Sequence, residues 1–301
     1  MDKNAQYFIT KSITIMASKP KVLVTGGNSG IGYALCKQLA IENNVHVFLG
    51  SRSEEKGEIA VKSIVESAPD AEVTLVVIDV SSDESVKAAA LSLAEEKPFH
   101  AIVNNAGAGL AHGVSCDGIM NVNLYGAKRV TEAFLPLINP DGGRLVGTSS
   151  GLASGYASGK FNGGPIGRLP LEQRGPLTSF DCTWDQLQTI MTSERELGYG
   201  EEGQAAGMAA YGLSKAALTA YHMILARENP NLLVSTISPG FINTNMTSGF
   251  GASLQPEEGT ISLRKCILQD LGDCKGWYYG SDGLRSPLDR TRNPGEPEYQ
   301  P

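Results

Sequence analysis

The sequence predicts an α/β fold in which helices cover both faces of a doubly wound parallel sheet. Short runs rich in Val, Ile and Leu recur along the first 150 residues, and stretches with helical spacing separate them. A glycine-rich turn follows the first run. Alternating strands and helices favour parallel pairing, because a crossover helix returns the chain to the same end of the sheet. At 41% apolar, the 301 residues can bury one large core without disulfide bridges.

The composition argues against several classes of protein. A net charge of −7 disfavours a general nucleic-acid binder, because neutralising phosphates needs clustered Lys and Arg. No apolar run has the length of a membrane span, so we expect no membrane partner. The five cysteines are scattered, and neither they nor the four histidines have metal-ligand spacing. We therefore expect reduced thiols, a cytoplasmic location and no metal site.

Residues 1–19 form a predicted N-terminal extension. They mix lysines with short apolar pieces but hold no continuous signal-peptide core. Met16 resembles a second possible start, so 1–15 is interpreted as a surface arm or a leader.

The segment Val22–Gly32 predicts a buried strand followed by a phosphate-binding turn. Glycines at positions 26, 30 and 32 interrupt the apolar run, and helical spacing continues over Tyr33–Ala40. Glycine lets an anion approach closely, while the N–H groups and dipole of a helix start attract it. The alternative is a tight turn with no ligand.

The second strand, Val45–Leu49, leads to a position that selects between dinucleotides. There an acid selects a free ribose 2′-hydroxyl, whereas an Arg accommodates a 2′-phosphate. Here Arg52 follows the strand, and no acid occurs before Glu54. Arg52 therefore favours NADP, because a guanidinium can bind a phosphate through two hydrogen bonds. The alternative is a solvated Arg at a helix start.

The third strand, Val73–Ile78, ends at Asp79 and Val80, where ligands bind in open α/β sheets. Asp79 could accept a hydrogen bond from an adenine amino group or could cap a turn. Ser81 and the Glu three residues later predict a capping box that opens a helix over Asp83–Glu96.

The fourth strand begins at Ala101 and breaks into a turn of small and polar residues. Asn104 and Asn105 could fix this loop or contact a ribose, and Ala106 and Gly107 leave space for a flat ring.

Gly118–Leu137 has the spacing of one long helix. Asn is unfavourable inside a helix, so Asn123 is expected to bond something specific. The fifth strand, Arg144–Gly147, ends at Ser149 and Ser150.

Residues 151–210 form an insertion far longer than an ordinary connection. They are rich in Gly and Pro until Asp181–Leu197, where Trp184, Leu187 and Met191 mark one face of an amphipathic helix. We interpret the insertion as a substrate cap, with a partly disordered linker as the alternative.

Tyr211 is predicted to open a helix, and Lys215, four residues on, shares its face. A sixth strand, Leu233–Ile237, then ends at Pro239-Gly240. The remainder is predicted to hold a helix over Pro256–Leu271, a strand over Gly276–Tyr279 and a surface tail over 283–301.

Several of these motifs resemble, in the same order, those of the short-chain dehydrogenases/reductases, over roughly residues 20–280. The motifs are Thr25-Gly26-Gly27-Asn28-Ser29-Gly30-Ile31-Gly32, Asn104-Asn105-Ala106-Gly107, Asn123, Ser150, Tyr211-x-x-x-Lys215 and Pro239-Gly240. The insertion before Tyr211 resembles the NADPH-dependent carbonyl reductase branch. The resemblance implies a Rossmann-type single domain over 20–301.

The resemblance also implies a site for NADPH and a catalytic tetrad. The tetrad would be Asn123, Ser150, Tyr211 and Lys215. The expected cofactor-binding residues are Thr25, Gly26, Asn28, Ser29, Gly30, Ile31, Gly32, Arg52, Asp79, Val80, Asn105, Ala106, Gly107, Tyr211, Lys215, Pro239, Gly240 and Thr244. Relatives that prefer NADP often carry Lys or Arg where this chain has Ser29, so recognition of a 2′-phosphate would depend largely on Arg52.

These residues predict the reduction of a ketone or aldehyde. Tyr211 would protonate the alkoxide that hydride transfer creates, and Ser150 would hydrogen-bond the carbonyl oxygen. An ammonium about 5 Å from a phenol, at an effective dielectric of about 20, favours phenolate by roughly 3 kcal/mol. Lys215 is therefore expected to lower the pKa of Tyr211 by about two units. The resemblance implies that Asn123 positions a water beside Lys215.

Two other functions use the same fold: an NADP-dependent alcohol dehydrogenase working oxidatively, and a sensor that binds NADP(H) without catalysis. The resemblance also implies that the insertion covers a helix face used in tetramers, which favours a monomer. Four aromatic residues indicate a hydrophobic small-molecule carbonyl substrate, although each could belong to the core: Phe161, Trp184, Phe241 and Phe250.

Overall fold

The computed structural model describes residues 18–300 except 110–112, 162 and 200–203. Seven parallel strands form one sheet in the order β3-β2-β1-β4-β5-β8-β9. The chain moves outward from β1 first on one side and then on the other, which confirms the predicted doubly wound parallel sheet. The strands are β1 (Lys21–Val24), β2 (His46–Ser51), β3 (Val73–Val77), β4 (Ala101–Asn104), β5 (Arg144–Thr148), β8 (Leu233–Ile237) and β9 (Lys275–Tyr279).

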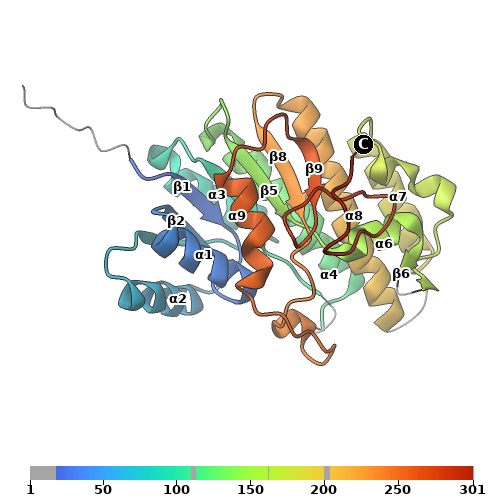
Figure 1. Ribbon diagram of the computed structural model, residues 1–301, viewed down its shortest axis with the longest axis horizontal. Coiled ribbons are helices and arrows are strands. Elements are labelled where there is room, and N and C mark those ends of the chain that lie inside the picture. The colour runs from blue at the N-terminus through green and yellow to red at the C-terminus, as the bar shows by residue number, and fades with distance from the viewer. Residues whose placement is uncertain (1–17, 110–112, 162, 200–203, 301) are drawn as a thin grey trace, which may run out of the picture.

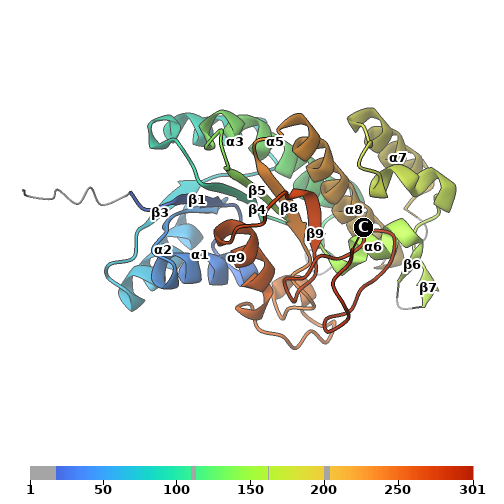
Figure 2. The same cartoon turned by 45° about the horizontal axis from the view of Figure 1, so that its top comes forward.

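Helices cover both faces of the sheet (Figures 1 and 2). One layer holds α1 (Gly30–Glu42), α2 (Glu54–Ser67) and α9 (Ile261–Leu268). The opposite layer holds α3 (Asp83–Ser92), α5 (Ala127–Phe134) and α8 (Gln204–Glu228). The remaining helical segments are α4 (Cys116–Met120), α6 (Gly151–Ser158), α7 (Trp184–Glu196), η1 (Ala94–Glu96), η3 (Asn121–Gly126), η4 (Leu135–Leu137), η5 (Leu171–Thr178), η6 (Asn245–Thr247) and η7 (Glu258–Thr260).

The two layers bury alternate residues of each strand. Leu23 of β1 and Phe48 of β2 belong to the core beneath α3, α5 and α8, whereas Val22 and Val24 belong to the core beneath α1, α2 and α9. Successive side chains of a strand point to opposite faces, so a sheet covered on both sides needs continuous apolar runs. This requirement explains why the central strands read as unbroken apolar segments.

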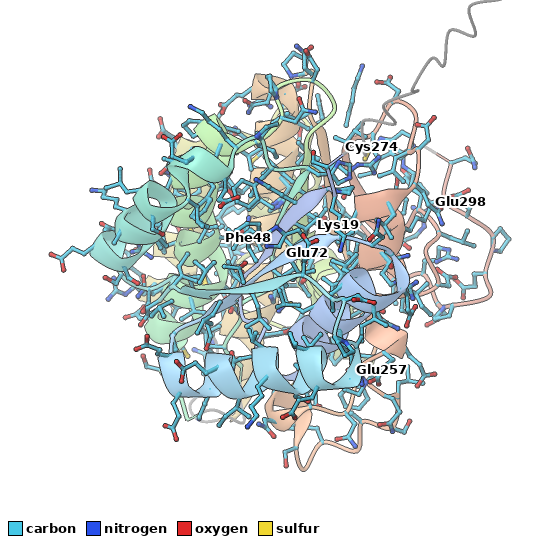
Figure 3. The ribbon with its side chains drawn as sticks, turned by 90° about the vertical axis from the view of Figure 1, so that its left-hand side faces the viewer. Lys19, Phe48, Glu72, Glu257, Cys274 and Glu298 are labelled. Carbon is cyan, nitrogen blue, oxygen red and sulfur yellow. The ribbon has the colours of Figure 1, made fainter. Side chains whose placement is uncertain are left out.

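An ion pair joins the residues that precede β1 and β3, near the β3 edge of the sheet. Figure 3 looks onto this edge, where Lys19, just before β1, and Glu72, just before β3, lie close together. Lys19 Nζ is 2.9 Å from a Glu72 carboxylate oxygen. Residues 1–17 of the predicted N-terminal extension lie outside the described residues, so that domain boundary stays a prediction.

The predicted capping box before α3 is wrong. Ser82 is the N-cap, and its Oγ accepts a hydrogen bond from the backbone N–H of Ser85. Ser81 lies one residue before the cap, and its own N–H and hydroxyl donate to the carboxylate of Asp79. The helix therefore starts one residue later than the predicted capping box.

Two predicted helices differ in their bounds. The single helix expected over Gly118–Leu137 is divided into α4, a π-helical segment (η3), α5 and the short η4. The helix expected to open at Tyr211 begins at Gln204, so Tyr211 lies within α8. A π-helical segment shifts the side chains that follow it, and such segments occur frequently at functional sites.

The insertion is a packed unit beyond α8, at the right of Figures 1 and 2. It contains α6, the short β6–β7 pair (Lys160–Phe161 and Gly164–Pro165), η5 and α7. The buried Glu194 carboxylate accepts from the backbone N–H groups of Arg168 and Leu169, and the buried Arg174 donates to three backbone carbonyls. These contacts contradict a disordered linker for the described part of the insertion.

Each of the five cysteines is free, as expected. Across the residues that the structure describes, none of the helices combines the length and apolar character needed to cross a bilayer.

Candidate active site

A cleft of about 1500 Å³ lies at the carboxyl ends of the central strands. Ligands of open α/β sheets bind at this edge, where the strand order reverses. Three of the four proposed catalytic residues line it, and so do all but one of the predicted cofactor-binding residues. These residues are Gly26, Asn28, Ser29, Gly30, Ile31, Gly32, Arg52, Asp79, Val80, Asn105, Ala106, Gly107, Ser150, Tyr211, Lys215, Pro239, Gly240 and Thr244.

The turn between β1 and α1 leaves room only for glycine. A side chain at Gly32 would place its first carbon 2.2 Å from the carbonyl oxygen of Gly26. Gly30 has a φ of +54°, which other residues rarely adopt. The N-cap Ser29 makes no side-chain capping hydrogen bond, so the N–H groups at the start of α1 are available to an anion in the cleft.

Thr25, the predicted cofactor residue that does not line the cleft, holds the turn in place from behind. Its Oγ1 donates to the carbonyl of Val103 and accepts from the N–H groups of Asn105 and Ala106, at 3.0–3.2 Å. The amide of Asn105 in turn donates to the carbonyl of Thr25 at 2.9 Å. These bonds support the loop-fixing alternative for Asn105.

Arg52 lies at the outer end of the cleft together with Lys56. Ser53 caps α2, and its Oγ accepts from the N–H of Lys56 at 3.3 Å. The exposed side chains of Arg52 and Lys56 thus lie beside the start of α2, and this arrangement suits a dianionic phosphate. Sequence reasoning missed Lys56, although its spacing of four from Arg52 could have identified it.

Asp79 lines the cleft at the end of β3, but its carboxylate is already engaged. Its Oδ1 accepts from the N–H of Ser81 at 2.9 Å and from the Ser81 hydroxyl at 2.6 Å. This geometry supports the turn-capping alternative, with the second carboxylate oxygen left for a ligand in the cleft.

The two serines after β5 have different environments. The Ser149 hydroxyl is buried and bonds the Lys215 carbonyl at 3.1 Å and the Thr219 hydroxyl at 2.8 Å. Ser150 is the N-cap of α6, and its Oγ accepts from the N–H of Leu152 at 3.2 Å. Accepting this bond leaves the Ser150 O–H free to donate into the cleft.

Tyr211 and Lys215 lie on one face of α8, as their spacing predicted. The Lys215 Nζ is 5.7 Å from the centre of the Tyr211 ring and donates to the carbonyl of Thr148 at 2.7 Å. Burial lowers the pKa of Lys215 to about 8. This ammonium is therefore fixed between the end of β5 and the phenol.

The expected downward shift in the pKa of Tyr211 is not found. Burial raises the pKa of Tyr211 to about 12, and the hydrogen bond with the Ser150 side chain opposes the increase. The expectation counted the attraction between phenolate and ammonium but not the cost of placing a phenolate away from water. Tyr211 is therefore a protonated phenol at neutral pH.

Asn123 lies in η3, behind the wall of the cleft. Its Oδ1 accepts from the N–H of Ala108 at 2.7 Å, and its Nδ2 donates to the Ala108 carbonyl at 3.0 Å and to the Ser214 hydroxyl at 2.9 Å. These bonds confirm that Asn123 has specific partners, and they fix the segment after β4 to α8.

The mouth of the cleft is apolar. Phe161, Phe241 and Phe250 line it, the latter two with 52% and 38% of their surface exposed. Trp184 instead takes the alternative left open for it, that of a packing residue, because its ring lies 6.0 Å from the Tyr125 ring and 5.6 Å from the Tyr221 ring. None of the described residues of α7 lines the cleft.

The C-terminal segment also lines the cleft, which sequence reasoning missed. It was predicted to be a surface tail, yet Thr291, Arg292 and Pro294 form part of the wall. Arg292, with its side chain 4% exposed, binds both carboxylate oxygens of Asp282 and donates to the Ser286 hydroxyl. The predicted coil held no pattern that could have revealed this pairing.

The chain is similar to known oxidoreductases in sequence and in structure. The short chain dehydrogenase family matches residues 20–161. The chain is 31% identical to a (+)-neomenthol dehydrogenase of Arabidopsis thaliana, over 85% of this chain and 94% of that protein. It is 30% identical to the NADPH carbonyl reductase 1 of Mus musculus, over 81% of this chain and 88% of that protein. The solved structure of a menthone neomenthol reductase from Mentha piperita has a TM-score of 0.71 at 25% identity, covering 88% of this chain and 100% of that one.

The fold and the cleft define an α/β protein with a dinucleotide-type site at the carboxyl ends of its strands. Together with the relatives, they show that the chain belongs to the short-chain dehydrogenase/reductase family.

Proposed function

We propose that the protein reduces a ketone or an aldehyde to an alcohol with NADPH. The observation that carries this proposal is the meeting of the Ser150 hydroxyl, the protonated Tyr211 phenol and the Lys215 ammonium in one cleft with the glycine turn. The similarity to an NADPH carbonyl reductase and to a neomenthol dehydrogenase supports it.

The residues have complementary tasks. NADPH, when bound, supplies the hydride that reduces the carbonyl carbon. The Ser150 O–H donates to the carbonyl oxygen, where negative charge develops. Tyr211 then transfers its proton to that oxygen, and Lys215 stabilises the resulting phenolate. The carbonyl thus gains a hydride and a proton, and the products are an alcohol and NADP⁺.

The protonation state of Tyr211 suits the proton transfer of carbonyl reduction. In that direction the phenol gives a proton, and in alcohol oxidation the same group takes it back as a phenolate. Burial raises the pKa of Tyr211 to about 12, so the phenol holds the proton that reduction needs.

The cleft supports NADP as the dinucleotide and an apolar carbonyl compound as the substrate. Arg52 and Lys56 provide positive charge at the end where a 2′-phosphate would lie. The Phe161, Phe241 and Phe250 side chains offer apolar surface at the other end. Trp184 and η5 lie over the outer face of α8, which supports a monomer.

The test is to follow NADPH absorbance at neutral pH with a panel of small and bulky ketones and aldehydes. We expect consumption with apolar carbonyl compounds. The Tyr211→Phe variant should lose about 10²–10⁴-fold in kcat and retain the dissociation constant for NADPH. Binding of NADPH without turnover of any compound would favour the sensor alternative, and an unchanged rate in Tyr211→Phe would exclude Tyr211 as the acid.

A further inference from the structure

We propose that Tyr278 is a positioning residue for this reaction, which acts by holding the backbone of Ser150 so that its hydroxyl points at the carbonyl oxygen of the substrate. The proposal depends on the role of Ser150 in the proposed function. Tyr278 lies on β9, more than 120 residues after Ser150, and did not belong to any motif noted in the sequence.

The contact that carries the proposal is a single hydrogen bond. The Tyr278 hydroxyl donates to the backbone carbonyl oxygen of Ser150 at 3.0 Å. Both residues line the cleft, and the Tyr278 side chain is buried, with 5% of its surface exposed. The bond therefore forms at the wall of the active site, away from bulk water.

This hydrogen bond completes the environment of the Ser150 carbonyl. The same oxygen accepts from the N–H of Ala153 at 2.9 Å, within the first turn of α6. A carbonyl oxygen has two lone pairs, so Ala153 and Tyr278 together satisfy it. The bond from Ala153 ties the peptide to its own helix, whereas the bond from Tyr278 ties it to the sheet.

Tyr278 is well held for this task. Its residue pairs with Thr236 of β8 in the parallel ladder, and its carbonyl accepts from the N–H of Ser286 at 2.8 Å. Burial raises the pKa of Tyr278 to about 12, while the hydroxyls of Ser238 and Ser154 oppose the increase. The phenol is therefore protonated and can donate throughout the neutral pH range.

The direction of the Ser150 side chain depends on this peptide. Ser150 is the residue at which β5 turns into α6, with extended backbone angles (φ −165°, ψ 155°). The bonded carbonyl carbon is attached directly to the Ser150 Cα, so a displacement of this peptide would move the Cα and, with it, the Cβ and the hydroxyl. Small displacements of a group that binds the reacting oxygen lower kcat more than KM.

The neighbouring Tyr279 offers a matched control. It lies on the same strand and is equally buried, but it points to the other face of the sheet, where it packs in the core beneath α1, α2 and α9. Its hydroxyl donates to the Cys274 sulfur at 3.9 Å. Removing this hydroxyl tests the general effect of losing a buried phenol from β9.

The experiment compares Tyr278→Phe with Tyr279→Phe in the NADPH assay. We expect Tyr278→Phe to lose about tenfold in kcat, the value of one hydrogen bond, with the KM for NADPH and for the carbonyl substrate unchanged. Tyr279→Phe should retain the wild-type kcat. An unchanged kcat in Tyr278→Phe, or an equal loss in both variants, would overturn the proposal. If Tyr278→Phe is recovered unfolded, Tyr278→Met replaces it, because Met fills irregular core space.

A double-mutant cycle with Ser150→Ala separates this proposal from the proposed function. If Tyr278 acts through the Ser150 hydroxyl, Tyr278→Phe should cause no further loss once Ser150 is Ala. A tenfold loss in that background would show that Tyr278 acts independently, which contradicts the proposal. A wild-type kcat for Ser150→Ala itself would instead remove the role of Ser150 from the proposed function.

Discussion

The two ends of the cleft are built in different ways. At the cofactor end, the phosphate-binding turn is one continuous segment, and backbone groups of Gly26 and the start of α1 form its surface. At the substrate end, side chains arrive from the insertion, from the loop after β8 and from the C-terminal segment, as Phe161, Phe241 and Arg292 illustrate. The glycine turn thus depends on local backbone geometry, whereas the other end of the cleft depends on segments far apart in the sequence.

Because of this difference, residues at one end of the cleft can be substituted without changing the other end. The glycine turn tolerates few substitutions, because a carbon added at Gly32 would lie 2.2 Å from a backbone oxygen. The exposed Phe241 and Phe250 have no such constraint, since they extend from a loop. A change at one end should therefore leave the kinetics of the other end unaltered, and variants at each end test that separation.

The largest effect is expected at the cofactor end. Replacing Arg52 by Asp exchanges a cation for an anion beside the expected 2′-phosphate, so the KM for NADPH should rise about 100-fold while the KM for NADH stays within about twofold. Steady-state kinetics with both dinucleotides measure this. Lys62→Asp, which changes an exposed lysine on the same helix α2, is the control. An equal rise for both dinucleotides would contradict the assignment of Arg52 to the phosphate.

A smaller effect is expected at the substrate end. Arg292→Met removes the ion pair with Asp282 and loosens the C-terminal segment from the wall of the cleft. The KM for a bulky carbonyl substrate should change about tenfold, because a wall of the site loses its support, and the KM for NADPH should not change. The exposed Arg290, paired with Asp289, gives the control Arg290→Met. A change in the KM for NADPH alone would break the separation between the two ends.

The smallest effect concerns Lys215, at the boundary between the two ends. Its folded-state pKa of about 8 lies below the usual 10.5, so the unfolded chain binds the proton more tightly. Burying the protonated amine therefore carries its full free-energy cost to folding below pH 8, and this cost decreases as the pH rises towards 10.5. We therefore compare the free energy of unfolding of the wild type with that of Lys215→Met. From pH 8 to pH 9.5, this difference should change by about 1–2 kcal/mol in favour of the wild type. Urea unfolding without ligand measures the difference, and parallel curves would contradict the low pKa.

Several features of the candidate site could be predicted because they depend on neighbours in the sequence. The glycine turn follows from steric rules that act over a few residues, and the shared face of Tyr211 and Lys215 follows from helical periodicity. Arg52 could be placed because the position after the second strand has a fixed relation to the first turn. The predicted strands differ from the observed ones by only a few residues at their ends.

Other features could not be predicted because they depend on burial. The pKa of Tyr211 was expected to fall, and it rises because the phenol is enclosed by segments that the spacing of residues does not bring together. Trp184 was a candidate for the substrate site, but the packing of α7 on α8 places it between Tyr125 and Tyr221. The apolar face of an amphipathic helix predicts that the face is buried, but it does not predict which residues pack against it.

The sequence by itself determined the individual strands, the glycine turn after β1 and the spacing of Tyr211 and Lys215 on α8, since each of these depends on interactions within a short stretch of chain. Only the tertiary structure decided which side chains close the substrate end, how Tyr278 reaches Ser150 and how Arg292 reaches Asp282. The physical reason is that these contacts join segments whose positions are set by the packing of two cores on a twisted sheet, and such packing is a property of the whole chain.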